Sequence, residues 1–402
     1  MAAGVKLAVI GAGRAAFSLP LVRDICLTPD LAGSAITFMD VDQGRLDMVY
    51  ELARRYATEM GADLRFAKTL DREAALREAD FVLNTAMVGG HDQQESDREL
   101  MEQHGYYRGV RLADEYRQFD LMLSVAHDIE RLCPEAWLIQ SSNPVFEGCT
   151  LMSRETDVKL IGLCHGHYGY KEIVEVLDLD PAQVTYEIPG FNHCIWMTHF
   201  RYQGQDAYPL IDEWIEDESE CYWRDWNPQF HQTQMSPAAV HMYHLYGLMP
   251  IGDTSRALWE ESWWYHLDDD AKRRWWGPLG GFDSAAGWAI YLEGLNRRIA
   301  QIREVASDPK RKVSEVFPPV HSGEQIVPII DSLVNDKPGS YQVNVPNDGA
   351  LRAIPDNVVV EVPAIIDGKG VRPLAVGWLP ETVMLGVMWP RWLQMERALA
   401  AY

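Results

Sequence analysis

Two short motifs supply side chains that could hold a metal ion. GLCHGHYG contains Cys164 and His165, and PGFNHCIW contains His193. A thiolate and an imidazole both ligate divalent metals, and a site with only these two protein ligands leaves positions open to water or substrate oxygens, as a Lewis-acid site requires. By residue type alone, the commoner case is a buried core thiol and a hydrogen-bonded core histidine. Both interpretations stand at this point.

The surrounding elements should bring these motifs to one edge of a sheet. Cys164 and His165 directly follow the apolar run LIGL, and His193 follows another short β segment. In an open α/β sheet, ligands bind outside the carboxyl ends of the strands. We therefore expect Cys164, His165 and His193 to face a common cleft.

A glycine turn near the N-terminus predicts a dinucleotide site. Gly11, Gly13 and Ala16 lie in GAGRAA, directly after the run KLAVI, where small residues permit a tight turn and let a helix N-terminus approach a pyrophosphate. Asp40 ends the next predicted strand, where an acid accepts hydrogen bonds from ribose hydroxyls and favours NAD over NADP. The alternative is a structural turn without a ligand.

The order of the elements predicts an α/β fold. Short β-branched runs alternate with helix-period segments such as 41–60 and 115–132, which indicates a Rossmann-like, doubly wound parallel sheet over residues 1–190. Residues 191–402 are richer in Trp, with longer helical patterns at 237–248 and 285–305 and a later strand, NVVVEVPAIID. This half predicts a mixed α+β domain for substrate, metal and oligomer contacts.

Composition excludes several classes of partner. The 402 residues include 36 Lys plus Arg against 59 Asp plus Glu, a net charge of −23, which disfavours nucleic acid and anionic lipid. The sequence shows neither a signal-peptide pattern nor a long apolar run, so we expect a cytoplasmic protein without a membrane segment. The six cysteines form no CxxC pair and are expected to be reduced.

Six longer motifs resemble glycoside hydrolase family 4, and most closely its bacterial NAD- and manganese-dependent α-glucosidases. They are SSNPVFEGCT, GLCHGHYGYKEI, PGFNHCIW, MYHLYGLMPIGDTSR, HSGEQIVPIID and NVPN…VVVEVPAIID. The resemblance spans nearly the whole chain. It implies NAD and Mn²⁺, or another divalent metal, as cofactors, a small glycoside as substrate, and a homodimer or homotetramer.

The resemblance also implies roles for individual residues. The family's metal ligands fall on Cys164 and His193, and the asparagine of its Asn-Pro motif, beside substrate and cofactor, falls on Asn143. His165 matches a position near the glycosidic oxygen and would act as an acid.

A proton-abstracting base is implied further along the chain. Asp253 in GDTSR matches the base of the closest members, and Arg256 follows one helical turn later as a substrate contact. Other branches use a tyrosine, which makes Tyr246 the second candidate.

The reaction implied by the resemblance is a retaining hydrolysis of an α-glucoside through elimination. NAD accepts a hydride from C3, a base removes the acidified C2 proton, the C1 group leaves, water adds and the hydride returns.

One loop departs from the family pattern. Between Tyr107 and Leu121 the chain is shorter than the nearest α-glucosidases and lacks a GPGG run, and it carries Arg108, Arg111 and Arg117. These arginines are either solvated surface residues or contacts to a sugar with an anionic C6 group, as in a sulfoquinovoside or a glucuronide.

Two other functions remain open on the sequence. A lactate- or malate-type NAD dehydrogenase would share these strands but would produce net NADH. A non-catalytic NAD-binding module would bind the cofactor without turnover.

Overall fold

The parallel half of the sheet has the strand order of a dinucleotide-binding fold. The computed structural model describes residues 4–104, 115–226, 233–257 and 263–402. Six parallel strands lie in the order β3-β2-β1-β4-β5-β6, which confirms the predicted Rossmann-like sheet. Their bounds are β1 Lys6–Ile10, β2 Ala35–Met39, β3 Arg65–Thr69, β4 Phe81–Asn84, β5 Trp137–Gln140 and β6 Lys159–Gly162.

Helices cover both faces of these strands. One face packs against α1 (Ala15–Cys26), α2 (Gln43–Met60), the C-terminal half of α13 (Ala285–Ser307) and α14 (Ile326–Asn335). The other face packs against α3 (Arg72–Leu76), α5 (Glu115–Leu132) and α6 (Val145–Glu155). The predicted helices at 41–60, 115–132 and 285–305 are therefore confirmed to within two residues at each end.

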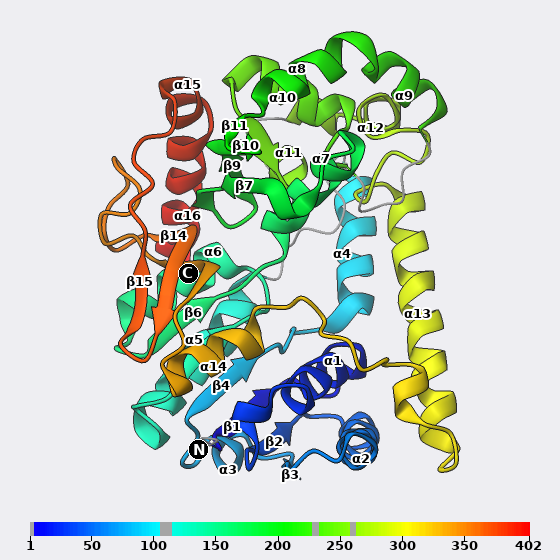
Figure 1. The fold of residues 1–402 in the computed structure, drawn as a ribbon, viewed down its shortest axis with the longest axis vertical. Helices are drawn as coiled ribbons and strands as arrows, with labels where there is room; N and C mark the ends of the chain where they lie inside the picture. The colour runs from blue at the N-terminus through cyan, green and yellow to red at the C-terminus, as the bar shows by residue number, and fades with distance from the viewer. Residues whose placement is uncertain (1–3, 105–114, 227–232, 258–262) are drawn as a thin grey trace.

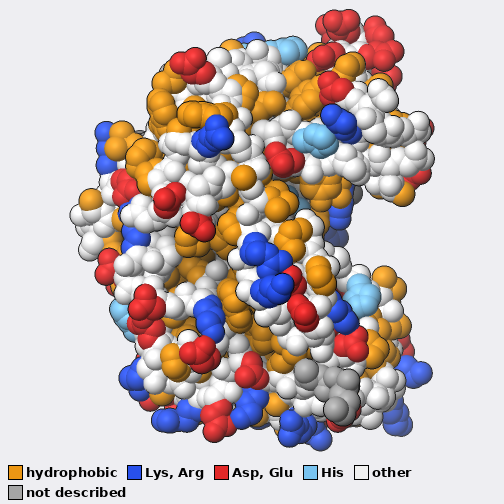
Figure 2. All heavy atoms as spheres, turned by 60° about the vertical axis from the view of Figure 1, so that its left-hand side comes forward, with side chains coloured by type: hydrophobic (Ala, Val, Ile, Leu, Met, Phe, Trp, Pro, Cys, Tyr) orange, Lys and Arg blue, Asp and Glu red, His pale blue; other side chains and the backbone are white. Residues whose placement is uncertain are grey.

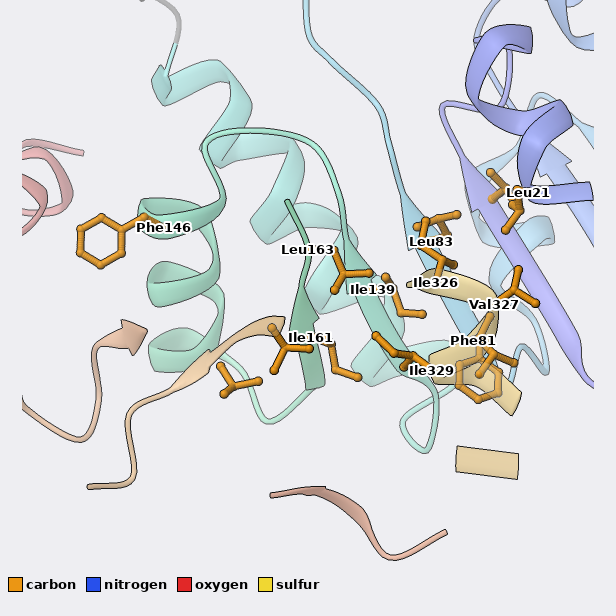
Figure 3. Close-up of a cluster of buried hydrophobic side chains, with 14 of the residues drawn as sticks. Leu21, Phe81, Leu83, Ile139, Phe146, Ile161, Leu163, Ile326, Val327 and Ile329 are labelled. Carbon is orange, nitrogen blue, oxygen red and sulfur yellow. The ribbon is translucent and has the colours of Figure 1, made fainter. Parts of the chain in front are cut away.

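Alternating side chains along each strand divide the core in two. Leu138 and Leu160 point to the α5 face, whereas Ile139 and Ile161 point to the α14 face. Figure 3 shows side chains of α14 gathered beside Phe81 and other strand residues. Because both faces are buried, these strands are almost uniformly apolar.

The sheet continues without a break into the second half of the chain. An antiparallel strand, β13 (Gly339–Pro346), pairs with β6 through Asn344 and Gly162, and further antiparallel strands extend the sheet to twelve. These are β14 (Val359–Asp367), β8 (Gly190–Phe191), β9 (Cys194–Met197), β12 (Met249–Ile251) and the side strand β15 (Gly370–Pro373). One sheet thus crosses residue 190, and the division into two domains there stays a prediction.

A separate hydrophobic cluster packs among the elements that form the upper part of the ribbon in Figure 1. It lies between a three-stranded sheet and several helices. These strands are β7 (Val184–Glu187), β10 (His199–Tyr202) and β11 (Gln205–Asp206). The helices of this region are α7 (Tyr170–Val176), α8 (Tyr208–Asp217), α9 (Ser219–Asp225), α10 (Pro237–Tyr246), α11 (Thr254–Ala257) and α12 (Asp269–Trp276).

Helices α4 and α13 connect the upper and lower parts. α4 (Gly90–Gln103) and the N-terminal half of α13 lie side by side in Figure 1, and His91 packs edge-on against Trp288 and Tyr291. In Figure 2 the outline is notched between the upper and lower parts, and acidic, basic and apolar side chains are interspersed over that face. Within the described ranges, no helix is long and apolar enough to cross a membrane.

The last helix, α16 (Trp389–Ala401), packs onto α6 of the parallel half, whereas the short helix α15 (Glu381–Val383) contacts α10. Arg391 of α16 forms a fully buried ion pair with Glu147 of α6, and Arg154 pairs with Glu396 at 2.7 Å.

Candidate functional site

A cavity of about 920 Å³ opens at the carboxyl edge of the parallel strands. Its wall is formed by residues that follow β4, β5 and β6, by the start of α4, and by the segments around His193 and Asp253. This is the edge at which open α/β sheets bind ligands.

Cys164 and His193 meet in this cavity. Cys164 follows β6, and His193 lies in the turn between β8 and β9 with a positive φ of 63°, which turns its side chain back toward β6. Cys164 Sγ lies 3.4 Å from His193 Nε2. Burial raises the pKa of Cys164 to about 12, and Glu361 adds to the rise. The thiol is therefore protonated until a cation displaces the proton.

Glu361 stabilises the turn that carries His193 through a hydrogen bond to the neighbouring Asn192. This glutamate lies on β14, is fully buried, and accepts a hydrogen bond from Asn192 Nδ2 at 3.0 Å. Burial raises its pKa to about 7. Sequence reasoning missed Glu361, although a charged residue in the apolar run VVVEVP was a usable signal.

Asp253 stands next to the Cys164–His193 pair. It follows β12, and its Oδ2 lies 3.6 Å from His193 Nε2. Arg256 holds the other oxygen, Oδ1, at 2.7 Å, and also contacts Asp283 Oδ1 at 2.9 Å. Asp283 is buried, and Arg256 and His266 hold its pKa below the usual range against the desolvation that raises it. Sequence reasoning missed Asp283 because nothing in GGFDSAAG marks it.

His165 also lines this cavity and forms a dyad with Glu324. The two side chains are 2.8 Å apart, between His165 Nε2 and Glu324 Oε2. This hydrogen bond raises the pKa of His165 above its ordinary value. The imidazole is thereby biased toward the protonated form, as a proton donor requires. Glu324, in HSGEQ, was not singled out in the sequence.

The glycine turn has the geometry that a dinucleotide requires. Gly11 has φ of +81°, and a Cβ there would lie 2.6 Å from Ala86 Cα. Gly13 donates its N–H to Asp40 Oδ2 at 2.7 Å, and a Cβ on Gly13 would lie equally close to that oxygen. Asp40 also accepts the N–H of Asp42 at 2.9 Å, which leaves further lone pairs for ribose hydroxyls.

The helix behind this turn is open to an anion. α1 begins after Arg14 without a side-chain cap, and Ala16 lies in its first turn. The exposed N–H groups of such a helix end bind phosphate. Asn143, beyond the end of β5, lines the same cavity. The turn, the acid at Asp40 and the cavity beside them thus fit a dinucleotide such as NAD.

The donor set also fits a divalent cation. Cys164 supplies sulfur, His193 supplies an imidazole nitrogen and the cavity supplies space for further oxygen ligands. Among the described residues, no three His, Cys, Asp or Glu side chains form a ready metal cluster. The sequence predicts a site with two protein ligands, Cys164 and His193, whose other coordination positions are open to water or substrate. That assignment stays a prediction.

Two predicted residues, Tyr246 and Arg117, do not join this group, and two others lie outside the described residues. Tyr246 ends α10 and packs against Trp196 at 5.3 Å between ring centroids, outside the lining of the cavity. Arg117 is exposed in the first turn of α5 and also does not line it. Arg108 and Arg111 fall outside the described residues.

Comparisons with known proteins identify the family. A model described as "Family 4 glycosyl hydrolase" matches residues 6–179, and its C-terminal domain model matches 188–402. An alpha-galacturonidase of Thermoanaerobacter italicus is 25% identical, with 94% of this chain and 84% of the relative covered. Other relatives are named alpha-galactosidase and alpha-glucosidase, so the family does not fix the sugar.

Solved structures share the fold. A 6-phospho-alpha-glucosidase from gut microorganisms, in complex with NAD and Mn²⁺, matches with a TM-score of 0.78 at 18% identity, covering 100% of this chain and 90% of the other. The lactate dehydrogenase of Eimeria maxima matches with a TM-score of 0.57 at 14% identity, covering 100% and 97%. The fold alone therefore does not separate a glycosidase from a dehydrogenase, but the family models do. The chain belongs to the family 4 glycosyl hydrolases.

Proposed function

We propose that this protein is an NAD- and divalent-metal-dependent glycosidase that cleaves α-glycosides. The observation that carries this proposal is the convergence of Cys164, His193 and Asp253 in one cavity beside the glycine turn. A lactate- or malate-type dehydrogenase has no need for a thiol and an imidazole in contact at this edge.

The side chains of the cavity would divide the work as follows. When bound, NAD supplies reversible hydride transfer and the metal supplies Lewis-acid stabilisation of developing negative charge. Cys164 and His193 would hold the metal, and Asn143 would orient the sugar. Asp253, fixed by Arg256, would remove the C2 proton, because its carboxylate lies beside His193 in the cavity. His165, held by Glu324, would donate a proton to the leaving oxygen.

We further propose that the sugar has an anionic group at C6, as in a glucuronide or a sulfoquinovoside. The relative named alpha-galacturonidase and the 6-phospho-alpha-glucosidase both act on sugars of this kind by name. The arginine-bearing segment between α4 and α5 connects two helices that each contribute to the cavity, through His91 and Gln118.

A substrate panel tests these proposals. The enzyme would be incubated with NAD, Mn²⁺ and a thiol reductant and offered 4-nitrophenyl α-glucoside, α-galactoside, α-glucuronide and α-sulfoquinovoside. We expect release of nitrophenol from the anionic glycosides without net NADH, and deuterium at C2 of the product in D₂O. Net NADH would favour the dehydrogenase, absence of C2 deuterium would exclude elimination, and equal cleavage of neutral glycosides would exclude the C6 preference.

We also propose that the chain forms a homodimer or homotetramer. Four large apolar side chains near the C-terminus stay exposed, namely Trp378, Leu385, Trp389 and Leu393. Exposed large apolar side chains that come together on a surface commonly become buried between subunits. Light scattering after size-exclusion chromatography should give a multiple of the 45.7 kDa chain mass, and a L385D/L393D variant should shift toward the monomer. A monomeric wild-type protein would contradict this.

A further inference from the structure

A second cavity adjoins the first on the other side of His165. It measures about 590 Å³ and lies between α1, α13 and the segment that leads into α14. His165 and Phe17 line both cavities, so these two side chains form a shared wall. Apolar side chains, including Pro20 and Val320, form much of the remaining lining.

One arginine of the lining, Arg298, is not matched by a neighbouring acid among the described residues. Arg298 of α13 is partly buried, and its guanidinium lies 4.5 Å above the ring of Phe317. No carboxylate in the described ranges forms an ion pair with Arg298. Burial lowers its pKa, and the neighbouring Arg23 lowers it further. A cation held in this way is costly unless an anion meets it.

The acidic residues of the lining do not pair with Arg298. Asp24 pairs with Arg23 at 3.2 Å, and it also accepts the backbone N–H of Ser322 at 2.9 Å and the Ser322 hydroxyl. Glu324, the other acid of the lining, pairs with His165. Both acids of the lining are therefore engaged by other groups, which leaves Arg298 as the arginine available to an anion in this cavity.

We propose that this second cavity receives the leaving group of the glycoside, and that Arg298 selects leaving groups that carry a carboxylate. The proposal rests on the proposed function, because His165 is taken to meet the glycosidic oxygen. The sugar then lies on the side of Cys164 and His193, and the group beyond the oxygen extends past His165 into the second cavity. The apolar lining accommodates a ring or chain, and the planar guanidinium matches a carboxylate in geometry and charge.

A matched pair of substrates tests the charge preference. For the sugar that the panel selects, kcat/KM is measured for the 4-carboxyphenyl glycoside and for its neutral amide analogue, the 4-carbamoylphenyl glycoside. The ratio of the two values cancels the effect of each variant on the chemical step. Arg298→Met should lower this ratio about tenfold or more, as expected for the loss of one charge-assisted contact.

The neighbouring Arg297 provides the control. It lies on the same helix but is exposed and does not line the second cavity, so Arg297→Met should leave the ratio unchanged. Arg298→Lys keeps the positive charge but lacks the planar guanidinium, so it should give an intermediate ratio of the two kcat/KM values. This variant replaces Arg298→Met in the test if the methionine variant does not fold. An equal ratio in the wild type and both Arg298 variants would overturn the proposal.

Calorimetry separates this proposal from the proposed function. Binding of 4-hydroxybenzoate to the enzyme with NAD and Mn²⁺ should be lost in Arg298→Met and kept in Arg297→Met, with 4-hydroxybenzamide binding weakly to all three. If no glycoside is cleaved but 4-hydroxybenzoate binds as described, the anion site at Arg298 is confirmed, whereas its assignment to a leaving group is wrong. If 4-hydroxybenzoate does not bind the wild type, the anion site itself is wrong.

Discussion

At the scale of single residues, Asp283 is placed to control the proposed base without touching it. Arg256 bridges Asp283 and Asp253, so its orientation depends on both carboxylates. Asp283→Asn removes one charge from this bridge, and we expect kcat/KM to fall roughly 10- to 100-fold, as for other residues that orient a site. NAD affinity, measured by calorimetry, should not change.

The control for Asp283 is Glu102→Gln. The buried Lys272 donates from Nζ to the backbone oxygen of Asp283 at 2.9 Å, and Glu102 lies 3.8 Å from the same Nζ. Among the described residues, no contact joins Glu102 to Arg256, so this variant changes a charge near Lys272 while leaving the Arg256 bridge in place. If Asp283→Asn and Glu102→Gln lose activity to a similar extent, Asp283 contributes to stability and does not specifically orient Arg256.

The metal site should respond to pH through Cys164. Its pKa is raised to about 12, so a bound proton must leave when a metal binds. Apparent Mn²⁺ affinity should therefore rise with pH, by up to about tenfold per unit below that pKa. Calorimetry at pH 6.5, 7.5 and 8.5 would measure the slope. Cys164→Ser should weaken binding and flatten the slope, whereas Cys221→Ser, on an exposed residue, should do neither.

Sequence motifs revealed the residues that would contact ligands. They did not reveal the residues that position those side chains. Cys164, His193 and Asp253 belong to recognisable motifs and do come together. The residues that position the site come from distant parts of the chain: Asp283 contacts Arg256, Glu324 contacts His165, and Glu361 contacts Asn192 beside His193. Their importance follows from burial and contact, which a single sequence does not display.

At the scale of elements, the turn between β1 and α1 should tolerate no side chain at Gly13. A Cβ there would lie 2.7 Å from Asp40 Oδ2 and would displace the carboxylate that organises the turn. Gly13→Ala should lower NAD affinity at least about tenfold. Gly294→Ala on α13 provides the control, because nothing lies within 4 Å of the position that its new methyl group would take. That variant should keep NAD affinity and gain up to about 1 kcal/mol of stability.

Helix α7 should make stability depend on pH through Glu172. Its Oε1 accepts the N–H groups of Gln234 and Met235 at 3.1 and 3.3 Å, and burial raises its pKa from 4.5 to about 7. Between those values the folded protein holds a proton that the unfolded chain releases, so stability falls as pH rises from 4.5 to 7. The free energy of unfolding should fall by roughly 3 kcal/mol at most, and by less to the extent that Glu172 is exposed to solvent.

Glu172→Gln removes this titration but keeps the acceptor oxygen. Its melting temperature, relative to the wild type, should therefore rise as the pH increases from 5 to 8. A constant difference between the two proteins over that range would contradict the buried, proton-holding state of Glu172.

Most helices and parallel strands were predictable because their apolar periodicity is regular. The helix predicted at 237–248 ends at Tyr246, followed by Gly247 with φ of +75°, a common helix stop. The placement of β13 beside β6 was not predictable. It depends on one long-range pairing, between Asn344 and Gly162, that no local pattern encodes.

At the scale of the whole molecule, the shared sheet implies that the two halves fold together. β6 is covered by β13, and one hydrophobic cluster contains both Ile161 and Val343. A fragment of residues 1–190 would expose that strand edge and its apolar neighbours. We expect the fragment to aggregate or remain unfolded, and the full chain to melt in one transition by calorimetry. A soluble fragment with a cooperative melt would show instead that residue 190 is a true domain boundary.

The second cavity has a consequence for how fast substrates arrive. Arg298 attracts an anion at short range, yet the whole molecule carries a net charge of −23 and repels the same anion at long range. Dissolved salt screens the distant repulsion first, because the Debye length is about 10 Å at 0.1 M. Capture of an anionic glycoside should therefore quicken as salt is added to a dilute buffer and slow again once the local attraction is screened. The ionic strength of the surroundings would then set the rate at which this enzyme collects its substrate.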